Sequence, residues 1–136
     1  MHQALSANTE GNNNVGIGYR ALKSNTTTGD NTAIGFEALL SNLGDANTAL
    51  GRDALRSNNS GDYNSAIGRG ALSGNTSGTR NIALGYGALD IPDTENDNLA
   101  VGFEALGGTI AGGELNVAIG NYLSLIHISE PTRPRI

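Results

Sequence analysis

The stretch Asn31-Thr-Ala-Ile-Gly-Phe-Glu-Ala-Leu39 decides the fold of this chain, because variants of it recur along most of the sequence. Six full copies and the start of a seventh, Asn116-Val-Ala-Ile-Gly120, share one pattern, Asn-x-Ala-(Ile/Leu)-Gly-x-x-Ala-Leu. The central glycine falls at positions 18, 35, 51, 68, 85, 102 and 120, in steps of 17, 16, 17, 17, 17 and 18 residues. Self-similarity at a fixed period of this size indicates a solenoid.

One unit is too short to bury a core alone, but stacked units share one. The Asn-x-Ala-(Ile/Leu)-Gly segment predicts one short strand per unit, with side chains that alternate between two faces. We expect the Ile/Leu face to point inward and the alanines, with Gly16 in the first copy, to form an outward face of small residues that another layer or chain can approach. The predicted core contains Ile17, Ile34, Leu50, Ile67, Leu84, Val101 and Ile119, closed by Leu22, Leu39, Leu55, Leu72, Leu89 and Leu106.

The Ala-Leu segment after each glycine is rich in helix formers, which favours a single helical turn per coil. A tight turn or a second short strand is the alternative. Stretches such as Ser24-Asn-Thr-Thr-Thr-Gly-Asp30 predict turns between units. Stacked units place asparagine over asparagine, in ladders that pair side-chain amides. The predicted fold is therefore mainly β: a parallel β-solenoid with one short strand and one turn in each coil of about 17 residues.

The composition excludes several function classes. The 136 residues contain no cysteine, which rules out disulfides, thiol nucleophiles and cysteine-based zinc sites. A formal net charge of −5 argues against a nucleic-acid partner. Because no apolar run approaches the length of a membrane span, we expect no membrane contact by this segment. His2 has no neighbours that suggest a catalytic triad or a metal site, so we expect no enzyme activity, no cofactor and no metal.

The last residues share nothing with the repeat. We predict a repeat solenoid over residues 1–122, truncated at both ends, and a disordered, non-native tail over residues 123–136. The segment from Leu123 to Arg133 matches the translation of a common transposase sequencing adapter, and the repeat fails where that match starts. A genuine polar tail is the alternative.

One row of residues is a candidate ligand-facing site. The residues directly after the repeat glycines are Tyr19, Phe36, Arg52, Arg69, Tyr86 and Phe103. On an exposed face, these aromatic and guanidinium groups could stack on sugars. The alternative, which we favour, is that they pack over the solenoid surface or at an interface between chains.

The Asn-(Thr/Ser)-Ala-Ile-Gly core resembles the head repeats of trimeric autotransporter adhesins. With the following Ala-Leu segment it looks still more like the repeats of phage tail-fibre-like proteins. The resemblance covers about residues 3–122, and the period here is longer than in the adhesin heads. It implies a homotrimer displayed on a cell surface or in a virion tail fibre, which attaches to a host glycan or protein and carries no catalytic residues. We therefore expect a structural or attachment segment of a fibrous surface protein, with a tail-fibre shaft or a carbohydrate-binding solenoid as alternatives.

Overall fold

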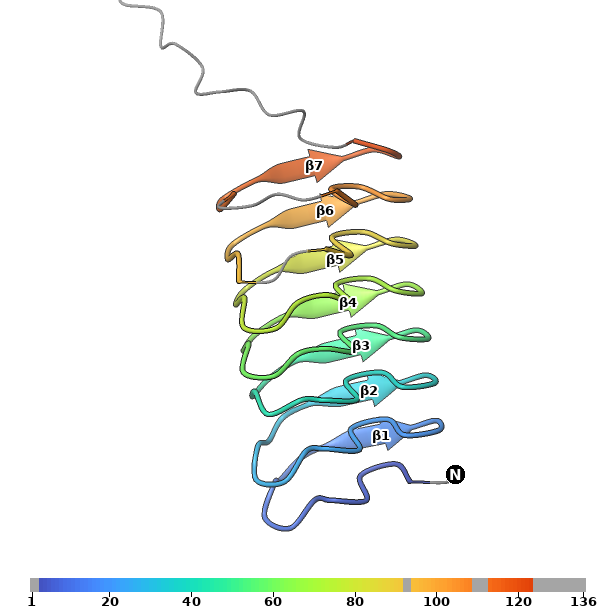
Figure 1. Cartoon of the computed structure of the whole chain (residues 1–136), viewed down its shortest axis with the longest axis vertical. Helices are drawn as coiled ribbons and strands as arrows, with labels where there is room; N and C mark the ends of the chain where they lie inside the picture. The colour runs from blue at the N-terminus through green and yellow to red at the C-terminus, as the bar shows by residue number, and fades with distance from the viewer. Residues whose placement is uncertain (1–2, 92–93, 109–112, 124–136) are drawn as a thin grey trace, which may run out of the picture.

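The chain forms a rod of stacked coils (Figure 1). The structure, a computed structural model, describes residues 3–91, 94–108 and 113–123. Seven parallel strands form one sheet in chain order, and like positions of the repeat face each other, as Ala33 faces Ala49. The strands are β1 (Val15–Ile17), β2 (Thr32–Ile34), β3 (Thr48–Leu50), β4 (Ser65–Ile67), β5 (Ile82–Leu84), β6 (Leu99–Val101) and β7 (Val117–Ile119). The predicted parallel β-solenoid is confirmed. Residues 124–136 of the predicted tail lie outside the described residues.

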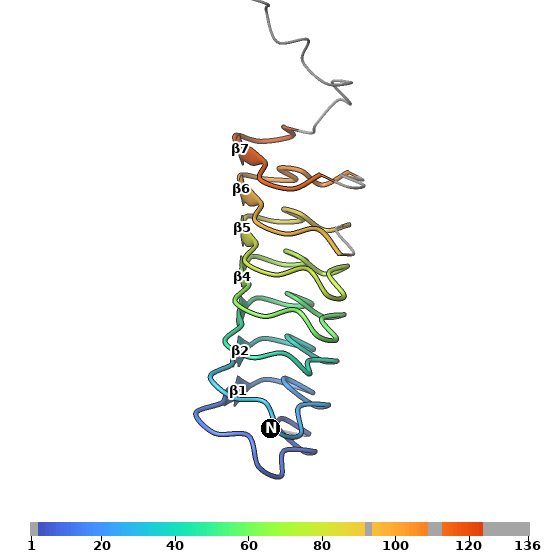
Figure 2. The ribbon, with the colours of Figure 1, turned by 90° about the vertical axis from the view of Figure 1, so that its left-hand side faces the viewer.

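The segment after each strand is a tight turn, which is one of the forms predicted for it, and another of these forms, a single helical turn, is not present in the described residues. Glu37 and Leu39 both have positive φ, at 53° and 50°, and the same two positions repeat this in the other complete coils. Right-handed helix requires negative φ at every residue, so such alternation prevents it. The backbone groups bond between coils instead, as when Leu39 N–H donates to the Ala54 carbonyl at 3.0 Å. Figure 2 shows the strands along one side of the rod and the turns away from them.

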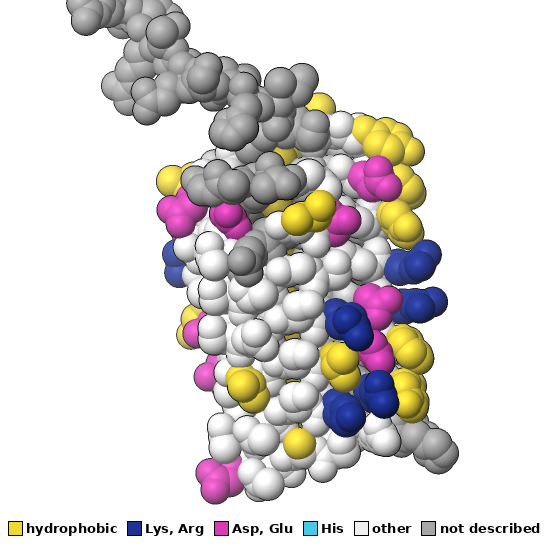
Figure 3. Space-filling model, viewed as in Figure 1, with side chains coloured by type: hydrophobic (Ala, Val, Ile, Leu, Met, Phe, Trp, Pro, Cys, Tyr) yellow, Lys and Arg dark blue, Asp and Glu magenta, His cyan; other side chains and the backbone are white. Residues whose placement is uncertain are grey.

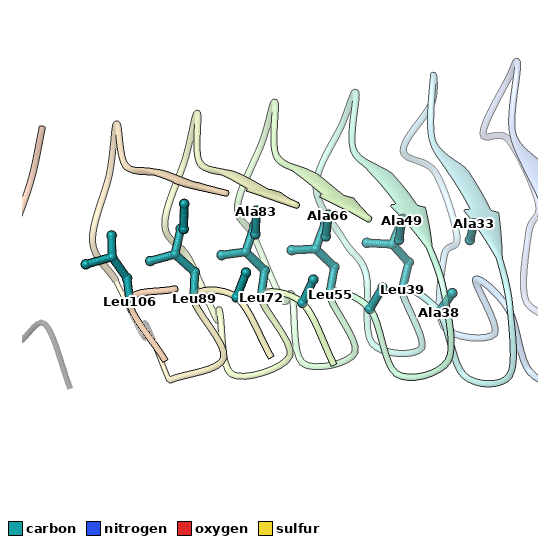
Figure 4. Packing of buried hydrophobic residues seen from close by; sticks show 14 of the residues in the cluster. Ala33, Ala38, Leu39, Ala49, Leu55, Ala66, Leu72, Ala83, Leu89 and Leu106 are labelled. Carbon is teal, nitrogen blue, oxygen red and sulfur yellow. The ribbon is translucent and has the colours of Figure 1, made fainter. Parts of the chain in front are cut away.

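The core consists of the leucines of the turns and the alanines of the strands. The six predicted core leucines are 0–1% exposed, and strand alanines such as Ala49 and Ala66 are fully buried. Figure 4 shows these leucines and alanines meeting in one line along the rod. The leucine half of the predicted core is therefore correct.

The other half of the predicted core is wrong, because the Ile/Leu face of every strand points outward. Ile17 is 48% exposed, Leu50 44% and Ile67 43%, and none of the seven side chains is buried. Each turn sends a leucine to the inner side of the sheet, which leaves room there only for a methyl group. The outward-facing side chains are those of Ile17, Ile34, Leu50, Ile67, Leu84, Val101 and Ile119.

Asparagine ladders explain why the alanines face inward. Asn47 lies two positions before Ala49, so both side chains point to the same face of the strand. The Asn47 backbone N–H donates to Asn31 Oδ1 at 2.9 Å, and its side-chain amide donates to the Gly61 carbonyl at 2.8 Å. These bonds hold the asparagine inside and thereby fix the opposite face as the outer one. Asparagine lies over asparagine as predicted, but in the middle of the rod each side-chain oxygen accepts from the next asparagine's backbone N–H instead of from its side-chain amide.

A second ladder runs through the turns. Asn58 Nδ2 donates to Asn42 Oδ1 at 2.7 Å and to the Gly61 carbonyl at 2.8 Å, and Asn58 is fully buried. Buried polar groups are tolerated when they are hydrogen-bonded. The ladders therefore let a rod with a small apolar core fill its interior with amides.

The repeat glycines permit this close stacking. Gly68 has φ of 129°, and a Cβ atom there would lie 2.4 Å from the carbonyl oxygen of Gly85 in the next coil. No other residue type fits this combination of backbone conformation and close approach. This explains why the position after each strand is glycine in all seven copies.

Candidate functional site

The six predicted ligand-facing residues form a line along the edge of the sheet where the strands end, here called the edge row. Each follows a repeat glycine, so the stacking of coils places one side chain above the next. Its aromatic members are 39–42% exposed. Figure 3 shows apolar and basic side chains following one another along this side of the rod. The edge row consists of Tyr19, Phe36, Arg52, Arg69, Tyr86 and Phe103.

The edge-row rings contact neighbouring rings and guanidinium groups along the rod. Tyr19 and Phe36 stack with centroids 5.3 Å apart, and the Arg52 guanidinium lies 5.2 Å from the Phe36 centroid. Tyr86 stacks on Phe103 with centroids 4.8 Å apart, and the Arg69 guanidinium lies 5.6 Å from the Tyr86 centroid.

A sugar needs an open ring face for stacking. In the edge row the ring faces are occupied by neighbouring rings and guanidinium groups. This arrangement favours packing along the rod over the sugar-binding alternative.

A shallow cleft of about 470 Å³ lies beside the edge row, but its charges are already paired. The Glu37 carboxylate, 8% exposed, accepts from Arg56 at 2.8 Å and from Arg20 at 3.2 Å. The hydrogen bond from Arg56 is the main reason that the pKa of Glu37 lies below its ordinary value. Asp53 in turn pairs with Arg52 at 3.1 Å. The cleft therefore offers an incoming ligand few free polar groups.

A smaller cleft of about 180 Å³ lies above it, where two coils carry glycine in place of a large side chain. Gly70 and Gly87 stand where the coils below have Glu37 and Asp53. The cleft ends at Asp90, whose Oδ1 atom is buried and has no hydrogen-bond partner among the described residues. Burial raises the pKa of this carboxyl. Because the buried oxygen is out of contact with solvent, a ligand in the cleft cannot reach it.

The largest unusual surface is one that the sequence reasoning placed in the core. The first and third residues of each strand form an outer sheet face, which carries no charged side chain and includes seven large apolar side chains that are 42–68% exposed. The signal for this exposure is the variable position, which accepts Thr48 and Ser65 as readily as isoleucine. The outer sheet face consists of Val15, Ile17, Thr32, Ile34, Thr48, Leu50, Ser65, Ile67, Ile82, Leu84, Leu99, Val101, Val117 and Ile119.

The turns that precede the strands carry acidic residues with a structural task. Asp45 Oδ1 accepts from the Gly29 backbone N–H at 2.7 Å, and Asp62 Oδ1 accepts from the Asp45 backbone N–H at 2.8 Å. Each carboxylate therefore ties its coil to the coil below. Within the described ranges, no group of three or more His, Cys, Asp or Glu side chains is placed to hold a metal ion.

Comparison with known proteins gives no match to a family model, to a curated protein or to a solved structure. Across the part of the chain that the structure describes, no helix has the length and apolar character of a membrane span.

Proposed function

We propose that this chain is a non-catalytic structural segment of a surface-exposed fibrous protein, in which copies of the rod associate side by side through the outer sheet face. The observation that carries the proposal is the apolar character of that face over all seven strands. The expected small-residue face cannot serve as the contact surface, because its alanines are buried. We therefore assign the contact between copies to the outer sheet face.

The size of the face supports association. Strand residues rise about 3.3 Å and parallel strands lie about 4.8 Å apart, so seven three-residue strands present roughly 340 Å². Exposed apolar patches of a few hundred Å² often mark interaction sites. A specific interface buries about 800 Å² per partner, so the flanking rows must contribute as well.

Another copy of the chain is the partner that fits this face best. Every coil repeats the same two outward positions, and each strand pairs with the next in constant register. A parallel copy has the same spacing along the whole rod, so its contacts stay matched from coil to coil. A partner with a different period loses the match after a few coils.

The length of the five-residue Asn-to-Gly segment is compatible with three copies around one axis. Packed sheets lie about 10 Å apart, which places each sheet about 5 Å from a shared axis. A triangle of that in-radius has sides of about 17 Å, which is also about the length of five extended residues. The segment from Asn to Gly in each coil has five residues, Asn64 to Gly68 in the β4 coil. We therefore propose a homotrimer with the outer sheet faces at its centre.

In this proposal the rod holds a binding part of the fibre away from a surface, and several chains supply avidity. The setting is a bacterial cell surface, where attachment is to a host glycan or protein, or alternatively a virion tail fibre. These settings differ in the domain that comes after the repeats. Reading the genomic DNA past codon 122 distinguishes them: a coiled coil and a membrane-anchoring domain support the adhesin, and a trimerising chaperone domain supports the tail fibre. Genomic codons for residues 123–136 would overturn the adapter interpretation.

Sedimentation equilibrium of the full chain tests the trimer. We expect three times the chain mass for the natural sequence. Leu50→Lys with Ile67→Lys places charges in the centre of the outer sheet face and should give a monomer with an unchanged circular dichroism spectrum. Leu43→Lys with Ile91→Lys is the matched control, since these side chains are 50% and 52% exposed away from the sheet; it should stay trimeric. A monomeric or dimeric natural chain, or a trimeric Leu50/Ile67 variant, would overturn the proposal.

A further inference from the structure

The two edges of the sheet differ in charge: one carries most of the basic side chains, several of them paired with Glu37 and Asp53, and the other is mainly acidic. The cationic edge, where the strands end, holds five of the six Lys and Arg side chains of the described residues. Figure 3 shows most Lys and Arg side chains on that side of the rod, with acidic side chains among them, and mainly acidic side chains along the opposite side. The cationic edge consists of Arg20, Lys23, Arg52, Arg56 and Arg69. The acidic edge, where the strands begin, consists of Asp30, Asp45, Asp62, Asp97 and Glu114, with Arg80 among them.

Charges without an ionic partner remain on both edges at the same height. Arg69 forms no ion pair with another described residue, and its guanidinium lies 5.6 Å from the centroid of the Tyr86 ring. Asp45 and Asp62 likewise have no cationic partner in the described ranges, and each uses one carboxylate oxygen for a backbone N–H. Asp62 precedes β4 and Arg69 follows it, so the two charges belong to the same coil but lie at opposite ends of its strand.

We propose, on the basis of the oligomer proposed above, that the cationic edge of one copy contacts the acidic edge of the next copy, with Arg69 of one opposite Asp62 of the other. All strands run in the same direction, so rotation about an axis parallel to the rod brings the end of one sheet beside the start of its neighbour's sheet. Such a contact is heterologous and closes into a ring. The partner is thus a second copy of this chain.

The pairing needs no displacement along the rod. Asp45 and Arg52 flank β3 in the same way that Asp62 and Arg69 flank β4. A closed ring allows no shift along its axis. At zero shift, Arg52 of one copy is level with Asp45 of its neighbour, and Arg69 is level with Asp62. Complementary charges at a rim speed association and fix register more than they add affinity. The apolar faces then provide the buried contact, while the edges set its alignment.

A charge exchange in the full chain tests this pairing. Arg69→Asp alone and Asp62→Arg alone should each weaken association about tenfold at low salt, because one attraction per interface becomes a repulsion. The exchanged chain with both changes should return to the natural affinity. Asp62→Asn removes the charge but leaves an oxygen for the Asp45 N–H, and should weaken association less. Glu10→Arg, an exposed charge away from the strands, is the control and should have no effect.

The outcomes separate this inference from the proposed function. A natural chain that is monomeric would overturn both the edge pairing and the proposed function. A natural trimer that Arg69→Asp and Asp62→Arg leave unchanged overturns the edge pairing and leaves the fibre proposal in place. Failure of the exchanged chain to recover also overturns the pairing. If Arg69→Asp leaves the trimer intact but abolishes retention on a heparin column, the cationic edge binds a polyanion, and the inference is wrong.

Discussion

The two faces of strand β4 differ in a way that sets the character of the whole rod. On the inner face, Ala66 is fully buried and Asn64 donates to the Gly78 carbonyl at 2.8 Å. On the outer face of the same strand, Ile67 is 43% exposed. The larger and more apolar side chain is thus the exposed one, and the smaller and the polar ones are inside.

This difference shows that available width governs the interior of a thin solenoid. The leucine of each turn already occupies the space next to the sheet, so the strand can add only methyl groups and amides. An isoleucine there would overpack the coil, and overpacking is destabilising. The apolar surface that does not fit inside is displayed outside, where a partner can cover it.

The leucine of the turn should give the largest effect. Leu72→Ala removes a fully buried side chain, and we expect a loss of about 2–5 kcal/mol of unfolding free energy. Ile67→Ala on the outer face removes a similar amount of apolar surface and should cost about 0.5 kcal/mol or less in the monomer. Urea unfolding at concentrations below association measures both. Equal losses would contradict the assignment of the two faces.

Two glycines in one turn sharpen the comparison between tight and open positions. Gly68→Ala places a Cβ atom against the Gly85 carbonyl at a φ of 129°, and should cost about 2–4 kcal/mol. Gly70→Ala meets no atom within 4 Å, so only its φ of 71° opposes it, at about 1 kcal/mol. Thermal unfolding of both variants provides the ranking, and the reverse order would show that the coils stack more loosely than these distances require.

Two adjacent asparagines, one buried in the turn ladder and one exposed, allow the contribution of the ladder to stability to be measured. Asn58→Ala removes a side chain that bonds to Asn42, Gly61 and Asn75, and leaves their groups unsatisfied. We expect a loss of about 1–3 kcal/mol. Asn59→Ala next to it is the control, because this side chain is exposed, and should change stability by about 0.5 kcal/mol or less. Chemical unfolding measures the unfolding free energy of both variants. Equal losses would show that the ladder does not contribute to stability.

The ion pairs of Glu37 should give the smallest effect, which appears on acidification. The pKa of Glu37 is lowered in the folded chain, chiefly by the hydrogen bond from Arg56, so its contribution is present above the ordinary glutamate pKa. It is lost as the pH falls through the lowered folded pKa, and amounts to about 1 kcal/mol or less. Glu37→Gln should remove this part of the pH dependence of unfolding between neutral and acidic pH. An unchanged pH profile in that variant would show that the pairs with Arg20 and Arg56 contribute nothing.

Periodicity alone predicts the parallel stack, its register, the asparagine ladders and the leucines of the core. It does not predict which face of the strand points inward. The Asn-x-Ala-Ile segment alternates clearly, but a ranking of its two faces by hydrophobicity selects the isoleucine face for burial, and that face is the exposed one. The regularity of each position carries the missing signal. Ala33, Ala49 and Ala66 stay constant while the position before them changes among Thr and Ser. A position with little space for its side chain tolerates no variation, whereas an exposed position does.

The shape of the turn could not be predicted from residue preferences. Leu39 and Leu55 adopt left-handed conformations that leucine rarely takes in isolation, because hydrogen bonds between coils and burial of the side chain offset the cost. For the same reason the contacts of the ring faces in the edge row could not be predicted from the sequence. Those contacts depend on the spacing between coils, which brings each ring over the next.

The hydrogen bonds between coils join each coil only to its two neighbours, and they run along the rod. If the rod is pulled from its ends, the terminal coil can therefore peel away while the remaining coils keep their bonds. Each released coil of about 17 residues extends to roughly 60 Å, against about 4.8 Å when stacked. The solenoid is consequently a stepwise extensible tether, which lengthens under tension more than tenfold per coil without losing the part of the rod that still holds.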